Sequence, residues 1–262
     1  MTYAPLQVAR TGLDAQSQRM RVIANNLANV NTTGFKRDRA DFETLAYQQV
    51  TAAGATSSGD NRYATGLNLG SGTRVAGTSR IMAAGTMNST DNPLDLAIEG
   101  DGFFSVARPD GPSGYPRAGA FQLSNEGKLV TSDGQAIQPE ISIPEGATSI
   151  TIGLDGTVTA TLAGEAAGSE VGKIEISRFA NPAGLQALGG NLYAETAASG
   201  SAQTGAAGSE GRGSIRQGAL EGSNVNIVQE LVDMIETQRA YEVNSKMISA
   251  TDEMLKNASQ QM

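Results

Sequence analysis

The residues that break helices are confined to the middle of this chain. Thirty of the 32 glycines lie between Gly54 and Gly222, and seven of the eight prolines lie between Pro93 and Pro182. Both ends can therefore form long helices, whereas the middle is interrupted so often that it favours strands and turns. The sequence predicts an α+β protein with long N- and C-terminal helices packed as a coiled coil, a β-rich antiparallel middle domain and extended linker ribbons.

Apolar residues recur at alternating three- and four-residue intervals near the N-terminus, which is typical of a coiled-coil face. The seam ends at a cluster of Asn and Thr residues. Gly34 follows this cluster, and we expect it to adopt the left-handed conformation that ends a helix. The candidate packing residues of this segment are Leu6, Leu13, Met20, Ile23 and Leu27.

The C-terminal segment begins with Asn226, a good helix cap, and continues without Gly or Pro. Apolar residues recur every seven positions from Ile227 to Ile248 and form one stripe of the expected helix. A second apolar stripe lies about 100° around the same helix, so one partner helix covers only one of the two stripes. The segment is therefore either buried in a monomeric core or packed by neighbours in an assembly. Its candidate packing residues are Ile227, Leu231, Met234, Tyr241 and Ile248.

Charge favours pairing between the two ends. Residues 1–50 carry six basic and four acidic side chains, whereas residues 223–262 carry three basic and six acidic ones. The two segments thus have net charges of opposite sign, and we expect each to pair with the other, within or between subunits, in preference to its own kind.

The middle of the chain reads as β-structure. Asp-Gly pairs at 101–102, 110–111, 133–134 and 155–156 are hairpin-turn signals, and residues 121–130 read as strand, turn and strand. We expect Phe103, Phe104 and Phe121 to lie in the β core. The predicted organisation is a terminal helical domain (1–33 plus 224–262), a connecting region (34–93 plus 182–223) with an extended ribbon at 48–70, and a β-rich outer domain (94–181).

Composition excludes several classes of site. The chain has no His or Cys, so it lacks Ser-His-Asp and Cys-His nucleophilic sites, imidazole or thiolate zinc sites and disulfides. A net charge of −8 argues against binding to nucleic acid, and we expect neither a cofactor, nor membrane insertion, nor a cleaved signal peptide. Carboxylates at Asp91, Asp95, Glu99 and Asp101 leave open a metal-dependent enzyme, although their spacing does not match a calcium loop.

Four segments carry a resemblance to a known family. They are TGLDAQ at 11–16 with VIANNLANVNTTGFKR at 22–37, LDLAIEGDGFF at 94–104, YPRAGAF at 115–121, and the stretch from SNVNI at 223–227 to QRAYEVNSK at 238–246. Together they resemble the flagellar basal-body rod family, which is shared by rod and hook proteins. The residues of the first motif that we single out are Asn25, Asn26, Asn29, Gly34 and Phe35.

The resemblance implies a structural protein without enzymatic activity. Copies would stack helically into a rigid hollow drive shaft, with terminal helices lining the inner tube and β domains forming the outer wall. The implied location is the flagellar basal body in the periplasm, reached by export through the lumen. The implied partners are further copies of the chain, proximal rod proteins, the hook protein, the surrounding outer-membrane and peptidoglycan ring proteins, and the type III export apparatus.

Within this family, the length of 262 residues and the segment at 38–70 favour a subunit of the distal rod. A proximal rod or hook-type axial protein is the nearest alternative, and a secreted β-type adhesin or scaffold is a rival from another class. We expect the ribbon to contact neighbouring subunits and to resist bending. Its candidate residues are Tyr47, Tyr63, Leu67 and Leu69.

Overall fold

The structure is a computed structural model that describes residues 4–58, 61–109, 111–163 and 168–260. It divides into two compact units. The helix-and-ribbon unit comprises Met1–Ala28, Asp38–Ser79 and Asn226–Met262, and the β body comprises Asn29–Arg37 and Arg80–Val225. Long helices at the two ends and antiparallel strands between them confirm the predicted α+β class.

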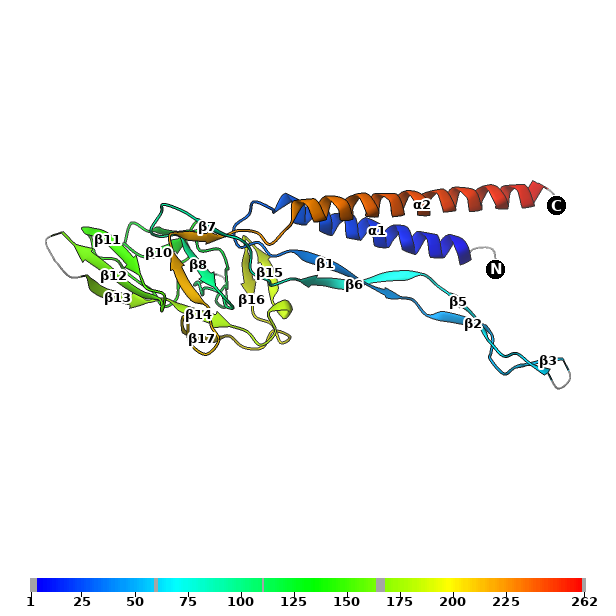
Figure 1. Cartoon of the computed structure of the whole chain (residues 1–262), viewed down its shortest axis with the longest axis horizontal. Helices are drawn as coiled ribbons and strands as arrows, with labels where there is room; N and C mark the ends of the chain where they lie inside the picture. The colour runs from blue at the N-terminus through cyan, green and yellow to red at the C-terminus, as the bar shows by residue number, and fades with distance from the viewer. Residues whose placement is uncertain (1–3, 59–60, 110, 164–167, 261–262) are drawn as a thin grey trace. The chain divides into compact units, whose positions relative to one another are not determined.

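Two helices form one part of the helix-and-ribbon unit. α1 (Ala4–Ala28) and α2 (Ile227–Gln260) lie side by side and run in opposite directions, so that the start of α1 and the end of α2 lie at the same end of the pair (Figure 1). α2 begins where the sequence predicts, because Asn226 Oδ1 accepts hydrogen bonds from the N–H groups of Val228 and Gln229 at 3.0 and 3.2 Å.

The prediction that Gly34 ends the first helix is wrong. α1 ends at Ala28, and turns follow it. Gly34 does have a left-handed backbone, with φ of 68°. The reason is a close approach between two segments: a Cβ atom at Gly34 would lie 2.7 Å from the backbone nitrogen of Ala118.

A long β-hairpin forms the other part of this unit (Figure 1). Its paired strands are β1 (Asp38–Thr44) with β6 (Thr73–Arg80), β2 (Tyr47–Thr51) with β5 (Leu67–Gly70), and β3 (Thr56–Ser58) with β4 (Asn61–Arg62). Residues 59–60 of the predicted ribbon lie outside the described residues. Gly72, with φ of 109°, lets the hairpin approach α1, since a Cβ atom there would lie 2.1 Å from Thr11 Oγ1.

The β body is built from short antiparallel pairs rather than one continuous sheet. The pairs are β7 (Met87–Ser89) with β19 (Ala219–Glu221), β8 (Leu96–Glu99) with β18 (Ser214–Gln217), β9 (Phe121–Leu123) with β10 (Leu129–Thr131), β14 (Glu175–Arg178) with β17 (Gln203–Ala206) and β15 (Gln186–Gly189) with β16 (Leu192–Ala194). A three-stranded sheet joins β11 (Ala147–Ile152), β12 (Thr157–Leu162) and β13 (Ser169–Lys173), and a short 3₁₀ helix covers Pro182–Gly184.

Three of the predicted hairpin turns are present in the β body. At Asp133-Gly134 the chain turns between Val130 and Ala136, which form an antiparallel bridge, and the Gly134 N–H donates to the Thr131 carbonyl at 2.9 Å. Residues 121–130 form β9, a turn and β10, and the turn at Asp155-Gly156 joins β11 to β12 with Ile152 opposite Val158. The prediction for Asp101-Gly102 is wrong, because β8 pairs with the distant strand β18 instead of the next strand along the chain. Residue 110 lies outside the described residues, so the turn expected at 110–111 is not described in full.

Two apolar clusters fill the β body. The larger contains Phe104 and Phe121, which lie edge to face with ring centroids 5.1 Å apart. The smaller is aromatic, and Phe103 packs in it against Phe179 and Tyr193 at 5.8 and 5.7 Å. All three phenylalanines expected in the core are buried.

Candidate functional site

The carboxylates considered for an enzyme do not form a metal site. The described parts of the chain contain no group of three or more His, Cys, Asp or Glu side chains that could hold a metal ion. Asp95 is buried and accepts a hydrogen bond from Asn92 Nδ2 at 3.0 Å, while Asp91, Glu99 and Asp101 are exposed. These side chains serve as turn and strand-end residues. Among the described helices, none is both long enough and apolar enough to cross a membrane.

Asn26 joins three elements of the helix-and-ribbon unit. Its Nδ2 donates to the carbonyl oxygen of Asp38 at 2.8 Å, and its Oδ1 accepts from the N–H of Asp38 at 3.0 Å. Nδ2 also donates to Glu230 Oε2 at 3.2 Å. The Asn26 and Glu230 side chains are both 1% exposed. One buried amide therefore connects the end of α1, the start of β1 and the first turn of α2.

Polar side chains also take part in the rest of the contact between α1 and α2. Arg19 lies 3.8 Å from Asp233, and Thr237 is fully buried. Gly12 allows close approach of Asn244, because a Cβ atom at Gly12 would lie 3.0 Å from its Nδ2. Polar pairs that need a defined partner give a helix contact more specificity than strength.

The strongest apolar surface of α2 faces away from α1. We call it the outer patch, and its members are Ile227, Val228, Leu231, Val232 and Ile235, which are 43–70% exposed. At about 100° per residue they span an arc of roughly 140°, opposite the arc that holds the buried side chains of α2. Large apolar side chains gathered on one exposed face mark an interaction surface.

The structure places the ten predicted packing residues in two environments. Ile23 is buried, and Leu6, Leu13, Met20, Leu27, Met234 and Ile248 are half-buried. Ile227, Leu231 and Tyr241 are exposed, at 46%, 43% and 41%. The contact within one chain thus covers the first set and leaves the second available to other molecules.

The four predicted ribbon residues are all exposed on the hairpin. Tyr47, Tyr63, Leu67 and Leu69 have between 47% and 64% of their surface accessible. Val50 at 58% and Phe42 at 41% join them. The hairpin consequently presents aromatic and aliphatic side chains that nothing within the described chain covers.

The other motif residues position the segment after α1. Asn29 Oδ1 accepts from Thr32 Oγ1 at 3.2 Å, and the N–H of Phe35 donates to the Thr32 carbonyl at 3.3 Å. The Phe35 carbonyl accepts from the N–H of Asn224 at 3.4 Å. Asn25 is exposed on α1. Asn29 and Phe35 therefore shape a turn within the β body, whereas Asn26 acts across the helix pair.

A buried charge network lies in the β body, and sequence reasoning did not find it. Lys36 Nζ donates to Glu221 Oε1 at 2.6 Å and to the Ala83 carbonyl at 2.9 Å. Arg117 Nε donates to Glu221 Oε2 at 2.5 Å, and its Nη atoms donate to three backbone carbonyls. Lys36, Arg117 and Glu221 are 1%, 4% and 2% exposed. Two cations thus share one buried carboxylate.

Burial and the neighbouring charges shift the pKa values of Lys36 and Glu221 in this network. Burial lowers the pKa of Lys36, and the nearby Arg117 adds to that effect, while Glu221 opposes it. Burial alone would raise the pKa of Glu221. The Arg117 charge, together with hydrogen bonds from Lys36, Arg117 and the Gly85 N–H, outweighs burial and holds that pKa below its usual value.

Three family models match segments of this chain. Residues 6–36 match the "Flagella basal body rod protein" model, residues 97–160 match the "Flagellar hook protein FlgE/F/G D1 domain", and residues 216–261 match the "Flagellar basal body rod FlgEFG protein C-terminal" model. The matches include Asn26, Lys36, Arg117, Glu221 and the outer patch.

Curated relatives are similar along nearly the whole chain. The flagellar basal-body rod protein FlgG of Buchnera aphidicola subsp. Schizaphis graminum is 49% identical over 97% of this chain and 98% of its own length. The FlgG protein of Caulobacter vibrioides is 46% identical over 97% of this chain and 98% of its own. That of Borreliella burgdorferi is 48% identical over 95% of each chain.

Proposed function

The chain belongs to the family of flagellar basal-body rod proteins, and from this premise we propose that copies of it polymerise helically into the hollow distal rod. Its function is structural, since its relatives are named as proteins of the basal-body rod. In the proposed rod, the polymer transmits motor torque to the hook and forms part of the export channel. Residues 1–33 and 224–262 line the inner tube, residues 34–93 and 182–223 connect, and residues 94–181 form the outer wall.

The outer patch of α2 carries this proposal. α1 already occupies the opposite side of α2, through a contact that includes Asn26 with Glu230 and Arg19 with Asp233, so the patch is left for another copy. Each apolar side chain of this size contributes about 1.5–3 kcal/mol when it is fully buried. A contact between unlike surfaces of successive copies does not close on itself and therefore builds a helical filament.

Charging the outer patch tests the proposal. Val232→Asp with Ile235→Asp should leave the β body folded and abolish polymerisation, because buried carboxylates at a subunit contact lack partners. Gln238→Asp with Ser245→Asp is the matched control, since it adds the same two charges at exposed polar positions of α2. Electron microscopy and sedimentation measure the polymer, and circular dichroism measures the fold. Normal filaments from the patch variant would contradict the proposal.

We further propose that the exposed apolar residues of the hairpin contact neighbouring copies and make the polymer straight. Replacing Tyr47, Tyr63, Leu67 and Leu69 together by Thr removes these exposed apolar side chains and keeps a residue type that favours strands. This variant should form curved or flexible filaments. Straight, stiff filaments from it would remove the hairpin from the account of rigidity.

The same premise supports the wider set of partners. The rod proposed here meets proximal rod proteins at one end and the hook protein at the other, and ring proteins surround it in the periplasm. Export through the lumen by the flagellar type III apparatus fits a chain without cysteine, because no disulfide can form before assembly.

A further inference from the structure

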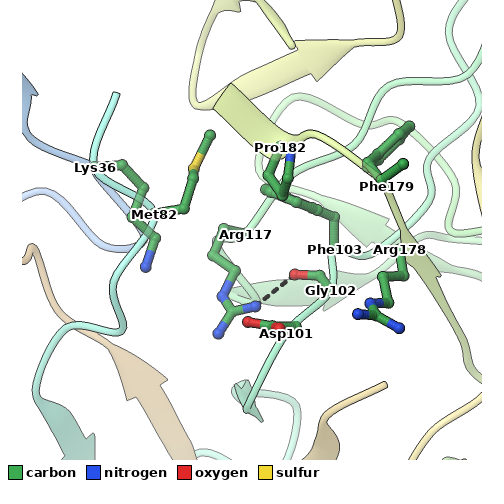
Figure 2. A pocket seen from close by; sticks show the side chains of 10 residues that line it. Lys36, Met82, Asp101, Gly102, Phe103, Arg117, Arg178, Phe179 and Pro182 are labelled. Carbon is green, nitrogen blue, oxygen red and sulfur yellow. Dashed lines mark hydrogen bonds between the residues drawn. The ribbon is translucent and has the colours of Figure 1, made fainter. Parts of the chain in front are cut away.

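A half-open cavity lies in the β body beside the buried charge network (Figure 2). Its volume is about 180 Å³, well above the roughly 15 Å³ that one water molecule needs. Polar and apolar side chains share its walls. The lining residues are Lys36, Met82, Asp101, Gly102, Phe103, Arg117, Arg178, Phe179, Ala180 and Pro182.

The charges around this cavity do not balance. Lys36, Arg117 and Arg178 supply three positive charges, whereas Asp101 at the rim and Glu221 behind the wall supply two negative ones. Lys36 and Arg117 both form ion pairs with the same carboxylate, that of Glu221. Burial and, to a smaller extent, the charge of Arg117 lower the pKa of Lys36, while Glu221 opposes both. A further anion would relieve this excess.

Donor groups remain for such an anion. Arg117 has five N–H donors, and four of them are used by Glu221 and by the carbonyls of Ile98, Gly100 and Gly102. Lys36 has three, and two are used by Glu221 and the Ala83 carbonyl. In the described part of the chain, one donor on each cation is therefore left. Arg178 at the rim makes only a long hydrogen bond, of 3.4 Å, to the Glu210 carbonyl.

The rest of the wall is apolar. Phe103 and Phe179 lie edge to face at 5.8 Å, and Met82 and Pro182 flank them in Figure 2. An apolar wall beside an unbalanced cation suits a carboxylate carried on an aliphatic or aromatic stem. A neutral polar group would gain less, because hydrogen bonds to a charged partner are about twice as strong as neutral ones.

We propose that this cavity binds a glutamate side chain, which carries its carboxylate on a two-carbon aliphatic stem, presented by a second copy of this chain. The inference rests on the proposed polymerisation. With a net charge of −8, the chain offers an excess of carboxylates to a cationic cavity, so the surface of one copy is complementary in charge to the cavity of another.

The binding arm of the test uses the unpolymerised protein and a small probe. 3-Phenylpropionate should shift the NMR signals of the Phe103 and Phe179 rings and the Met82 methyl group. Its neutral analogue 3-phenylpropanamide should bind at least about tenfold more weakly, since it lacks the charge. Equal binding of the two probes, or the absence of any shift, overturns the proposal.

Two variants of residues that line the cavity test whether 3-phenylpropionate binds there. Arg178→Gln, at the exposed rim, and Lys36→Met, which removes the surplus charge, should each weaken binding of 3-phenylpropionate about tenfold. Arg216→Gln is the matched control, because Arg216 is exposed on β18 and does not line the cavity. Wild-type affinity in both cavity variants would place the probe elsewhere and overturn the assignment.

The polymerisation arm tests the second copy as the occupant. 3-Phenylpropionate should slow filament growth at the concentrations at which it binds, and 3-phenylpropanamide should not. Binding without any effect on growth overturns the claim that a second copy fills the cavity. A protein that never polymerises contradicts the proposed function instead, and the binding arm still reports on the cavity.

Discussion

The two units of this molecule distribute their apolar side chains in opposite ways. In the β body, Phe104 and Ile98 are fully buried and the large apolar residues form two clusters. In the helix-and-ribbon unit, Val228 is 70% exposed and Tyr47 is 64% exposed, while Asn26 and Glu230 are buried. The β body thus buries most of its large apolar residues, whereas many of those in the helices and the hairpin are exposed.

This difference shows which unit can bury its apolar side chains within a single copy. The β body satisfies its own core, so a single copy provides the hydrophobic free energy for its fold. The helix pair is joined by polar contacts and half-buried apolar side chains but leaves the outer patch exposed, and helices in proteins gain most of their stability from packing of an apolar face. The structure therefore points to a body that folds by itself and a helical part that is completed by neighbouring copies.

The largest expected contrast comes from deleting one large side chain in each unit. Phe104→Ala should destabilise the β body by about 3–5 kcal/mol, because it leaves a cavity in a closed core. Val228→Ala, at an exposed position of α2, should change the stability of the single copy by no more than about 0.5 kcal/mol. Chemical denaturation of the unpolymerised protein measures both. Similar losses in the two variants would remove the contrast.

In the buried charge network, removing the carboxylate and removing one of the two cations should have different effects on stability. Glu221→Gln leaves Lys36 and Arg117 without a counter-charge, which should cost about 3–5 kcal/mol. Lys36→Met leaves the balanced pair of Arg117 and Glu221 and should cost at most about 1 kcal/mol or stabilise the fold. Thermal unfolding ranks the two variants, and a larger loss in Lys36→Met would refute the surplus of positive charge.

The Glu221 carboxylate of the same network makes the stability of the β body depend on pH. The pKa of Glu221 in the folded protein is held below its ordinary value of 4.5 by the Arg117 charge and the hydrogen bonds to Glu221, so the contribution of Glu221 to stability is present above that ordinary value and is lost as the pH falls through the folded pKa. The β body should therefore lose stability on acidification below about pH 4.5. In Glu221→Gln this component should be missing, so a slope of unfolding free energy against pH equal to the wild-type slope would contradict it.

Much of the fold follows from local sequence signals. Helices at both ends, the cap at Asn226 and the hairpins at residues 121–130 and at Asp155-Gly156 were predictable, because each depends on residues close in sequence. The end of α1 and the role of Gly34 were not, since Gly34 is required by the backbone of Ala118, far along the chain. The pairing of β8 with β18 is long-range for the same reason.

Local sequence patterns identify some of the functional residues, whereas others are recognised only from contacts between distant parts of the chain. Periodicity identifies apolar candidates such as Leu231, and the family motif singles out Asn26, but neither says what Asn26 holds. The network of Lys36, Arg117 and Glu221 joins residues up to 185 positions apart, so no local pattern reveals it. That a buried Arg or Lys needs a carboxylate partner can be predicted. Which carboxylate it pairs with cannot, because the chain contains many of them.

The smallest predicted effect concerns Asn26 and stays within the helix-and-ribbon unit. Asn26→Ala removes the three hydrogen bonds to Asp38 and Glu230 and leaves buried polar groups behind, so it should cost about 1–3 kcal/mol. Hydrogen exchange should become faster in α1 and α2 and should not change in the β body. Asn25→Ala is the matched control at the neighbouring exposed position, and we expect it to change exchange far less.

This last measurement separates two accounts of the polar contact between the helices. If the contact fixes only which helices pair, Asn26→Ala should loosen the single copy while polymer, in which the outer patch is covered, recovers most of the protection. If the contact also carries the stability of the assembled helices, the polymer should remain as unprotected as the single copy. We expect recovery, because the apolar side chains of the outer patch outweigh three hydrogen bonds in free energy.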